Sequence, residues 1–533
     1  MTNDDTVTGD ETEREPLRLL RRFWHVWVPC ALALLAVVFY AGALGFRGFG
    51  PEIVELLQGS KGSSPQHLKT LHPGFELLGA ILGGDSASAY GALRLLSCLL
   101  VAGSLPAIWG LGRKLGDWRT ATVASVVFAA LPQIAGIATS ISVGALFIFT
   151  WSWFLRLLVV DRHAWYSTLL LWLLGALLFL TWPVFPLWLV LWLYLELRHS
   201  TVDARSPDVL DGELPPAAIP LAVLVAPIAV FVLATAMHPG FWADPAQGWK
   251  LFMQHAMSTS GPVFSFAGTT YEHARPPIWT GLRLLWWYLP AFVVVAMGIG
   301  WARLIGDRRA TGRSGTLLRQ MFLWGVPLVC ALPWLHRGPS YGEIEFTFVL
   351  APFVAVLSGD VLAAGVRSIA GFTRQNLMPS GGVVAGAAFA TIFLGMLVLI
   401  TVRAHPVEGS YYSHYAGGFK GAVETGLEVS RDGVYPIPVL KRARQRMGAA
   451  KMRAVGGGDL LKSYSKAGFI PRGGGSGDIS KADGLVRRLE AFQPGSKSTR
   501  TNPDAMVSVT AGASPLLRID GIPVFWLERH TTP

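Results

Sequence analysis

Long apolar runs separated by short polar segments dominate the chain up to about residue 400. A helix needs about 20 apolar residues to cross a bilayer, and most of these runs reach that length. The pattern predicts about eleven membrane-spanning helices. Their expected ranges are Trp24–Phe46, Ala89–Leu111, Thr120–Ile137, Ser142–Val160, Trp165–Thr181, Val184–Leu197, Ala217–Met237, Ile278–Ile305, Leu317–Leu335, Glu345–Val366 and Gly382–Val402.

Two neighbouring runs, Trp165–Thr181 and Val184–Leu197, are separated only by Trp182 and Pro183. They form either two spans or one helix kinked at the proline, because buried spans tolerate proline. The two alternatives place everything downstream on opposite sides of the membrane.

The distribution of Lys and Arg bears on this choice, because cytoplasmic loops of membrane proteins carry an excess of basic residues. With the N-terminus inside and two crossings around Pro183, the basic residues fall in consecutive inner loops. They are Arg113, Lys114, Arg119, Arg156, Arg162, Arg198, Arg205, Arg303, Arg308, Arg309, Arg313, Arg319, Arg367 and Arg374. One crossing would break this alternation. The pattern therefore favours a cytoplasmic N-terminus and an extracytoplasmic C-terminal tail.

Three parts of the chain follow from this pattern. Residues 1–23 are expected to be a disordered cytoplasmic tail, and 24–403 a transmembrane domain with long outer loops at 47–88 and 238–277. Residues 404–533 are expected to be a small soluble α/β domain outside the membrane. Within it, Leu517–Ile519 and Ile522–Leu527 flank an Asp-Gly pair, a pattern typical of a β-hairpin. The predicted fold class is mainly α: a polytopic transmembrane helical bundle with a small C-terminal α/β domain.

Composition agrees with a membrane protein. The chain of 533 residues is 52% hydrophobic and 15% charged, with a mean hydropathy of +0.43, whereas soluble domains carry about 25% charged residues. The net charge of +11 does not indicate nucleic-acid binding, because the basic residues lie in short loops without a basic, aromatic-rich stripe. Cys30, Cys98 and Cys330 all lie in apolar runs and form no disulfide framework.

No common soluble-enzyme motif is present: the chain has no Walker loop, no HExxH and no CxxC. No metal site and no cofactor are expected. Placing an ionisable group within the bilayer costs free energy, and such groups are usually functional. Any catalytic chemistry is therefore expected where ionisable groups meet the outer face of the bundle. Asp360, near the inner end of its span, is instead expected to be a structural cap or an ion-pair partner.

Several short motifs occur in an informative order. The first outer loop and the following span contain Pro51-Glu52, Leu71-His72-Pro73, Gly84-Asp85-Ser86 and Leu93-Arg94-Leu95. The second long loop opens with His238–Pro245 and closes with Phe266–Trp279. After the last expected span comes GSYYSHYAGGFKGAVETGLEV, residues 409–429. This ordered set resembles the GT-C superfamily of membrane glycosyltransferases, and within it the protein O-mannosyltransferase and aminoarabinose-transferase branch, family 39.

The resemblance implies transfer of a sugar from a polyprenyl-phosphate-linked donor to an extracytoplasmic acceptor, which is a protein, a lipid or a glycan. It also implies an outer-loop carboxylate that acts as general base. Pro51 stands where the family has Asp, so the expected catalytic residues are Glu52 and Glu55. The residues expected to bind substrate are His72, Arg94, Lys250, His255, Tyr271 and Arg275. The implied location is a bacterial inner membrane.

Most of these residues also have an ordinary structural explanation. Glu52 and Glu55 fit a solvated interfacial helix, His72 fits a turn, and Arg94 fits a snorkelling or carboxylate-paired side chain. Lys250, His255 and Arg275 fit solvated loop charges.

The stretch Ala138–Gly144 also lacks the Arg and the acidic residue that the family often has there, and 341–345 lacks a basic one. The alternative is therefore a catalytically degenerate relative that binds polyprenyl-phosphate lipids or acts in envelope assembly. A transporter is disfavoured, because no internal repeat is visible.

Overall fold

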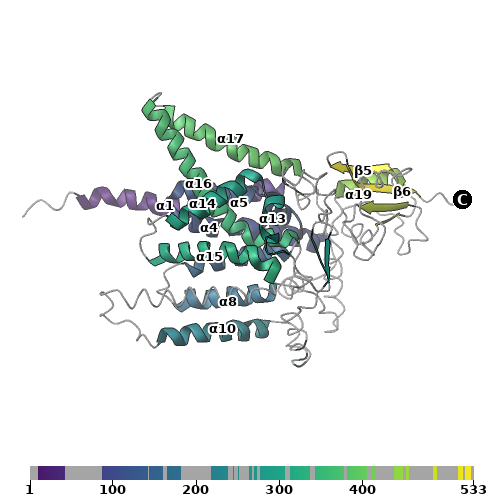
Figure 1. Ribbon diagram of the computed structural model, residues 1–533, viewed down its shortest axis with the longest axis horizontal. Coiled ribbons are helices and arrows are strands. Elements are labelled where there is room, and N and C mark those ends of the chain that lie inside the picture. Colours follow the sequence, from purple (N-terminus) through teal and green to yellow (C-terminus); the bar gives the residue numbers. More distant parts are fainter. Residues whose placement is uncertain are drawn as a thin grey trace, which may run out of the picture.

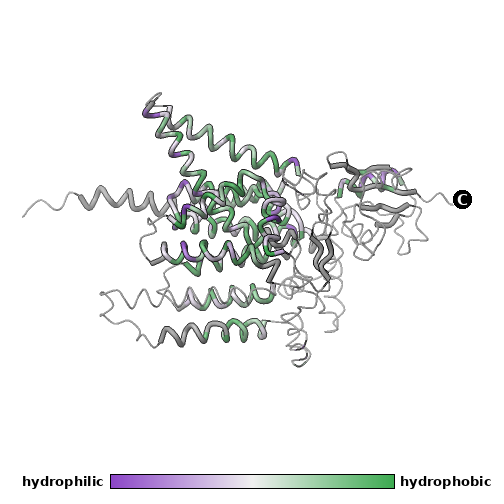
Figure 2. Tube along the Cα trace, viewed as in Figure 1, coloured by the Kyte–Doolittle hydropathy of each residue, from purple (hydrophilic) through white to green (hydrophobic). Residues whose placement is uncertain are grey.

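The computed structural model describes residues 10–42, 87–141, 143–159, 165–181, 218–237, 244, 246, 250, 263–266, 269–272, 277–306, 313–335, 343–376, 381–404, 411, 413, 437–447, 452–454, 484–488, 514–519 and 522–529. Within these ranges the chain is mostly helical, and most of the helices run alongside one another in one bundle (Figure 1). Figure 2 shows that apolar residues cover most of the described length of these helices. The protein is an integral membrane protein.

Twelve helices described in residues 10–404 belong to the bundle and its outer end. They are α1 (Asp10–Ala41), α4 (Ala87–Leu115), α5 (Trp118–Ala130), α6 (Pro132–Thr139), α7 (Val143–Leu158), α8 (Trp165–Thr181), α10 (Ala218–Met237), α13 (Thr280–Tyr288), α14 (Ala291–Gly306), α15 (Arg313–Leu335), α16 (Glu343–Asn376) and α17 (Gly381–Ala404). Between α10 and α13, strands β1 (Val263–Phe266) and β2 (Thr269–Glu272) pair antiparallel.

Three described segments are each long and apolar enough to cross a bilayer: Gly91–Leu115, Phe348–Gln375 and Val384–Ala404. The bent pair α5 and α6 makes a fourth candidate, and several shorter apolar helices accompany them. The total of eleven spans stays a prediction, since Val184–Leu197 lies outside the described residues.

The structure differs from the sequence-based ranges at three places. The expected span Thr120–Ile137 is divided into α5 and α6, which are bent by 63°. The expected span Ile278–Ile305 is divided into α13 and α14, because Pro290 provides no backbone N–H and Leu289 before it is extended. Helix α1 already begins at Asp10, so the part 10–23 of the expected disordered tail is helical; acidic residues at its start favour a helix N-terminus.

Small residues bring α5 close to its two neighbours. A Cβ added to Gly112 of α4 would lie 2.8 Å from Ala121 Cα, and one added to Gly359 of α16 would lie 2.8 Å from Ala124 Cα. Small residues at such crossings let helix backbones approach, which is how spans gain packing without a hydrophobic driving force. Helix α5 is therefore held between α4 and α16 at the centre of the bundle.

Charged side chains join the helices at one end of the bundle, here called the inner end. Arg367 of α16 lies 2.8 Å from Asp117, which precedes α5 and accepts a hydrogen bond from the Thr120 amide. Arg303 of α14 pairs with Asp360 of α16 at 3.1 Å, so the expected ion-pair role of Asp360 is confirmed. Burial acts to raise the pKa of Asp117, but the Thr120 N–H and the Arg367 guanidinium outweigh it and lower that pKa.

The described part of the tail lies beyond the opposite end, here called the outer end (Figure 1). It contains α19 (Ile437–Met447) and a four-stranded sheet in the order β3-β4-β6-β5. The strands are β3 (Met452–Ala454), β4 (Gly484–Arg488), β5 (Ser514–Ile519) and β6 (Ile522–Arg529). The predicted hairpin is confirmed, since β5 and β6 pair antiparallel with Ile519 opposite Ile522. Arg442 of α19 donates to the Leu516 carbonyl of β5 at 3.2 Å.

Candidate functional site

The break between α5 and α6 shapes the outer end of the bundle. Pro132 occupies the first turn of α6, and Leu131 before it is extended, with φ −64° and ψ 128°. Proline disfavours the helical conformation at the residue that precedes it, so the chain turns at this point. All eight residues of α6 are buried. The expected span does not continue straight to the outer end. Its outer part is instead the buried helix α6, which lies at an angle to α5.

Gln133 places a buried amide near the start of α6. Its side chain is 3% exposed, and its Nε2 donates to the backbone carbonyl of Tyr288 at the end of α13. Its Oε1 has no hydrogen-bond partner within the described part of the chain. Leaving a buried acceptor unmatched costs about 1–3 kcal/mol, so Gln133 is a polar feature that packing alone does not explain.

At the other end of α6, two buried hydroxyls are satisfied locally. Thr139 donates to the Ala135 carbonyl and Ser140 to the Gly136 carbonyl, each at 2.9 Å. The family that the chain resembles often has an Arg and an acidic residue in this stretch. Its described hydroxyls instead serve the helix backbone.

Arg94 lies in the outer part of α4, which packs against α6. Its side chain is 4% exposed in a largely apolar helix. One turn later, Ser97 is also buried, and its Oγ has no hydrogen-bond partner in the described residues. Ionisable groups inside membrane helices are rare and usually mark functional sites. Arg94 and Ser97 are therefore the described polar pair best placed for a ligand.

The start of the tail contacts the same region through α13. Ser413 is fully buried; its backbone N–H donates to the Trp287 carbonyl at 2.6 Å and its hydroxyl to the Trp286 carbonyl at 2.5 Å. Tyr411, two residues earlier, is largely buried, and this burial raises its pKa to about 12. Backbone carbonyls in the last turn of α13 therefore accept one hydrogen bond from α6 and two from the tail.

Only some of the predicted site residues lie in the described ranges. Arg94 is in the bundle, Lys250 is exposed in the second long loop, and Tyr271 pairs with Phe264 in the hairpin of β1 and β2. The remaining five lie outside the described residues: Glu52, Glu55, His72, His255 and Arg275.

Sequence reasoning missed Gln133, Ser97 and Ser413. Gln133 carried a usable signal, since it is a polar residue directly after Leu-Pro inside an apolar run. Ser97 and Ser413 carried none, because serine is common both in spans and in loops.

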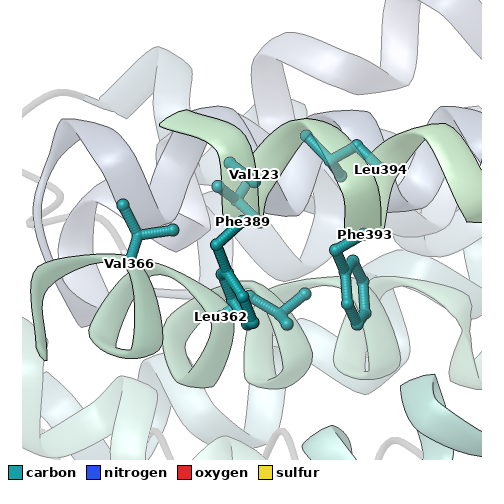
Figure 3. Close-up of a pocket in the computed structure, with 7 residues that line it drawn as sticks. Val123, Leu362, Val366, Phe389, Phe393 and Leu394 are labelled. Atoms are coloured by element: carbon teal, nitrogen blue, oxygen red, sulfur yellow. The ribbon is translucent and has the colours of Figure 1, made fainter. Parts of the chain in front are cut away.

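The described residues contain no group of three His, Cys, Asp or Glu side chains placed to hold a metal ion. A small apolar pocket lies between α5, α16 and α17. Figure 3 shows it lined by Val123, Leu362, Val366, Phe389, Phe393 and Leu394. Its lining offers no polar group for catalysis, so it is separate from the candidate site.

No protein-family model matches the chain, and no curated protein matches its sequence. Solved structures do show similarity. An apo oligosaccharyltransferase from Archaeoglobus fulgidus aligns with a TM-score of 0.47 and 12% identity, over 87% of this chain and 66% of that one. The chain thus spans just under two thirds of that protein's length.

Two further solved structures contain a lipid phosphate. The oligosaccharyltransferase AglB from Archaeoglobus fulgidus, in complex with an inhibitory peptide and a dolichol-phosphate, aligns with a TM-score of 0.47 and 11% identity, over 88% of this chain and 70% of that one. ArnT from Cupriavidus metallidurans bound to undecaprenyl phosphate aligns with a TM-score of 0.40 and 13% identity, over 94% and 97% of the two chains.

Proposed function

We propose that this chain is a membrane glycosyltransferase of the GT-C type, which moves a sugar from a polyprenyl-phosphate donor to an extracytoplasmic acceptor. The observation that carries the proposal is the burial of Arg94 within the Leu93-Arg94-Leu95 motif, near the outer end of an apolar span. A guanidinium in that position suits a lipid phosphate, since Arg binds phosphate oxygens through paired charge-assisted hydrogen bonds.

The chemistry assigns a role to each predicted residue. An acceptor hydroxyl or amine attacks the anomeric carbon, the bond from that carbon to the phosphate oxygen breaks, and the phosphate leaves with the electron pair. Glu52 takes the acceptor proton as general base, with Glu55 as its partner. Arg94 stabilises the charge that develops on the leaving phosphate. The Ser97 hydroxyl adds a hydrogen bond to the same group. His72, Lys250, His255, Tyr271 and Arg275 contact donor or acceptor from the two outer loops.

The proposed orientation follows from the basic loops. The N-terminus is cytoplasmic, and the tail from 404 onward is an α/β domain outside a bacterial inner membrane. The ion pairs Asp117–Arg367 and Arg303–Asp360 then lie at the cytoplasmic end, whereas Arg94 and Gln133 face the side where the acceptor is found. Donor, acceptor and tail thus meet at one surface.

A second candidate function is a non-catalytic relative that binds polyprenyl-phosphate lipids or acts in envelope assembly. Pro51 in place of the family's Asp favours it. So does the stretch from Ala138 to Gly144, which contains no ionisable residue. Both functions need Arg94 for lipid-phosphate binding, so the binding experiment precedes the transfer experiment.

The test compares the parent with Arg94→Ala in membranes that contain the full chain. Binding of undecaprenyl phosphate and transfer from radiolabelled polyprenyl-phosphate sugars are measured. Arg94→Ala should lower both at least tenfold, because a charged hydrogen-bond partner of the phosphate is lost. Arg113→Ala, at the other end of the same helix, is the matched control and should change neither.

Three outcomes separate the candidates. Transfer by the parent that depends on Arg94 supports the enzyme. Lipid binding that depends on Arg94, without transfer from any donor, supports the non-catalytic relative. Lipid binding that is equal in the parent and Arg94→Ala would overturn both.

A further inference from the structure

Helix α13 has one buried face and one exposed apolar face. Thr280, Leu284 and Tyr288 are buried at successive turns. On the other side, Ile278 and Leu282 are each 59% exposed and Trp279 is 53% exposed. Trp286 is partly exposed beside them. Ile278, Trp279, Leu282 and Trp286 are called the α13 face below.

Helix α13 cannot rotate to hide this face. A Cβ on Gly281 would collide with the Cys330 carbonyl of α15, so this side of α13 lies directly against another backbone. At the other end, the carbonyls of Trp286 and Tyr288 are held by Ser413 and Gln133. Turning the α13 face inward would break these buried hydrogen bonds. Each broken bond would leave a buried carbonyl without a donor, which costs about 1–3 kcal/mol of stability. The apolar side chains must therefore be covered from outside.

The length of α14 sets the depth of the α13 face. Helix α14 has 16 residues, which rise about 24 Å at 1.5 Å per residue. Its inner end is marked by the pair Arg303–Asp360 and by Arg319, which donates to the Leu304 carbonyl at 2.7 Å. The hydrocarbon core of a bilayer is about 30 Å thick. Helix α13, which precedes α14 at the outer end (Figure 1), therefore lies near the outer boundary of that core.

The composition of the α13 face suits this depth. Tryptophan collects at the boundary between headgroups and acyl chains. Arg283 is exposed next to Leu282, and its Cζ lies 5.8 Å from the centre of the Trp287 ring. Along α14, the apolar span that directly follows α13 in the chain, Val295 and Ile299 are also exposed. The place of the α13 face beside an apolar span, its depth and its tryptophans make lipid, and not a separate protein partner, the occupant that fits.

We propose that the α13 face binds the outer leaflet of the membrane at the boundary between headgroups and acyl chains, with Arg283 at the level of the lipid phosphates. Helix α13 is then an interfacial anchor. Because its last turn also holds Ser413, it keeps the first residues of the tail at the membrane surface. This role does not depend on the catalytic proposal.

The test measures the depth of a spin label at position 282. Leu282→Cys is made in the full chain with exposed Cys30 replaced by Ser; Cys98 and Cys330 are buried. The labelled protein is reconstituted into phosphatidylcholine–phosphatidylglycerol vesicles, and collisions with oxygen and with a water-soluble nickel chelate are compared. Val295→Cys gives the reference inside the bilayer, and Lys441→Cys, at an exposed position of α19, gives the reference in water.

The label at 282 should collide with oxygen more than the Lys441 label and with nickel more than the Val295 label, which places it at the boundary. Nickel access equal to that of Lys441 would overturn the proposal, because the face would then be in water. Low access to both reagents would also overturn it, because protein would then cover the face. Trp279→Cys repeats the measurement one turn earlier if Leu282→Cys does not fold.

Discussion

Gln133 of α6 donates its side-chain amide to the backbone carbonyl of Tyr288, 155 residues later in the chain, and both residues are buried. The bond joins the helix behind the break at Leu131 to the end of α13, where Ser413 of the tail is also bound. The outer end of the bundle, the interfacial helix and the tail therefore share one buried junction.

Replacing Gln133 tests this junction. Gln133→Met keeps the approximate shape but removes the donor to Tyr288, and it also removes the unmatched Oε1. We expect a net loss of about 1 kcal/mol, because the buried carbonyl of Tyr288 loses its partner. Thermal unfolding in detergent measures the change. Gln320→Met, which removes only an exposed bond from Trp324, should change stability by less than about 0.5 kcal/mol. Equal Tm values for the parent and Gln133→Met would contradict this role.

The pair Asp117–Arg367 predicts a pH-dependent contribution to stability. The folded-state pKa of Asp117 lies below its ordinary value of 3.8, so the ionised form stabilises the fold. This contribution is complete above about pH 5 and is lost as the pH falls through the folded-state pKa.

Asp117→Asn isolates the charge, because Asn still caps the start of α5. Its Tm should be lower than that of the parent at pH 7, and the difference should shrink below pH 4. A difference that stays constant from pH 7 to pH 3 would show that the charge has no part in it.

Close packing around α5 predicts opposite results for two glycines on α16. Gly359→Ala places a methyl group 2.8 Å from the backbone of Ala124, so α5 and α16 must separate, at a cost of roughly 1–3 kcal/mol. Gly371 has open space at the Cβ position, so Gly371→Ala should be neutral or slightly stabilising. Unfolding in detergent compares the two. Similar behaviour of both variants would argue against the tight crossing.

Glu52→Gln tests the catalytic assignment. The substitution keeps the shape and removes the charge, so the protein should still insert and still bind undecaprenyl phosphate. Transfer from a radiolabelled donor should fall by about a hundredfold, as expected when a general base is lost. Undiminished transfer by Glu52→Gln would rule out Glu52 as the base.

Reporter fusions test the orientation. A reporter that is active only outside the cytoplasm should give signal when fused after Ala404 and none after Arg309, because the basic loops place these two positions on opposite sides. The reverse pattern would overturn this eleven-span topology, and a single crossing between Trp165 and Leu197 would produce it.

Local patterns in the sequence were enough to predict much of the fold. The length of an apolar run predicts a membrane helix because every backbone group in lipid must be paired within the helix. The alternation around Asp520-Gly521 likewise predicted the pairing of Ile519 with Ile522. From its depth alone, Asp360 was predicted to be a structural cap or an ion-pair partner; the structure shows the ion pair, and its partner Arg303 was not predicted. These features depend on neighbours in the chain.

The breaks at Pro132 and Pro290 needed the tertiary structure. Within an apolar run, proline is compatible with a kinked span or with two separate helices, and the neighbouring helices determine which one forms. Gln133 could be recognised as a polar residue in a span, but its partner Tyr288 could not, since nothing local connects positions 155 residues apart. Composition and periodicity determine what must enter the membrane. Only the packed helices determine which buried polar groups meet, because each must find its partner on another helix.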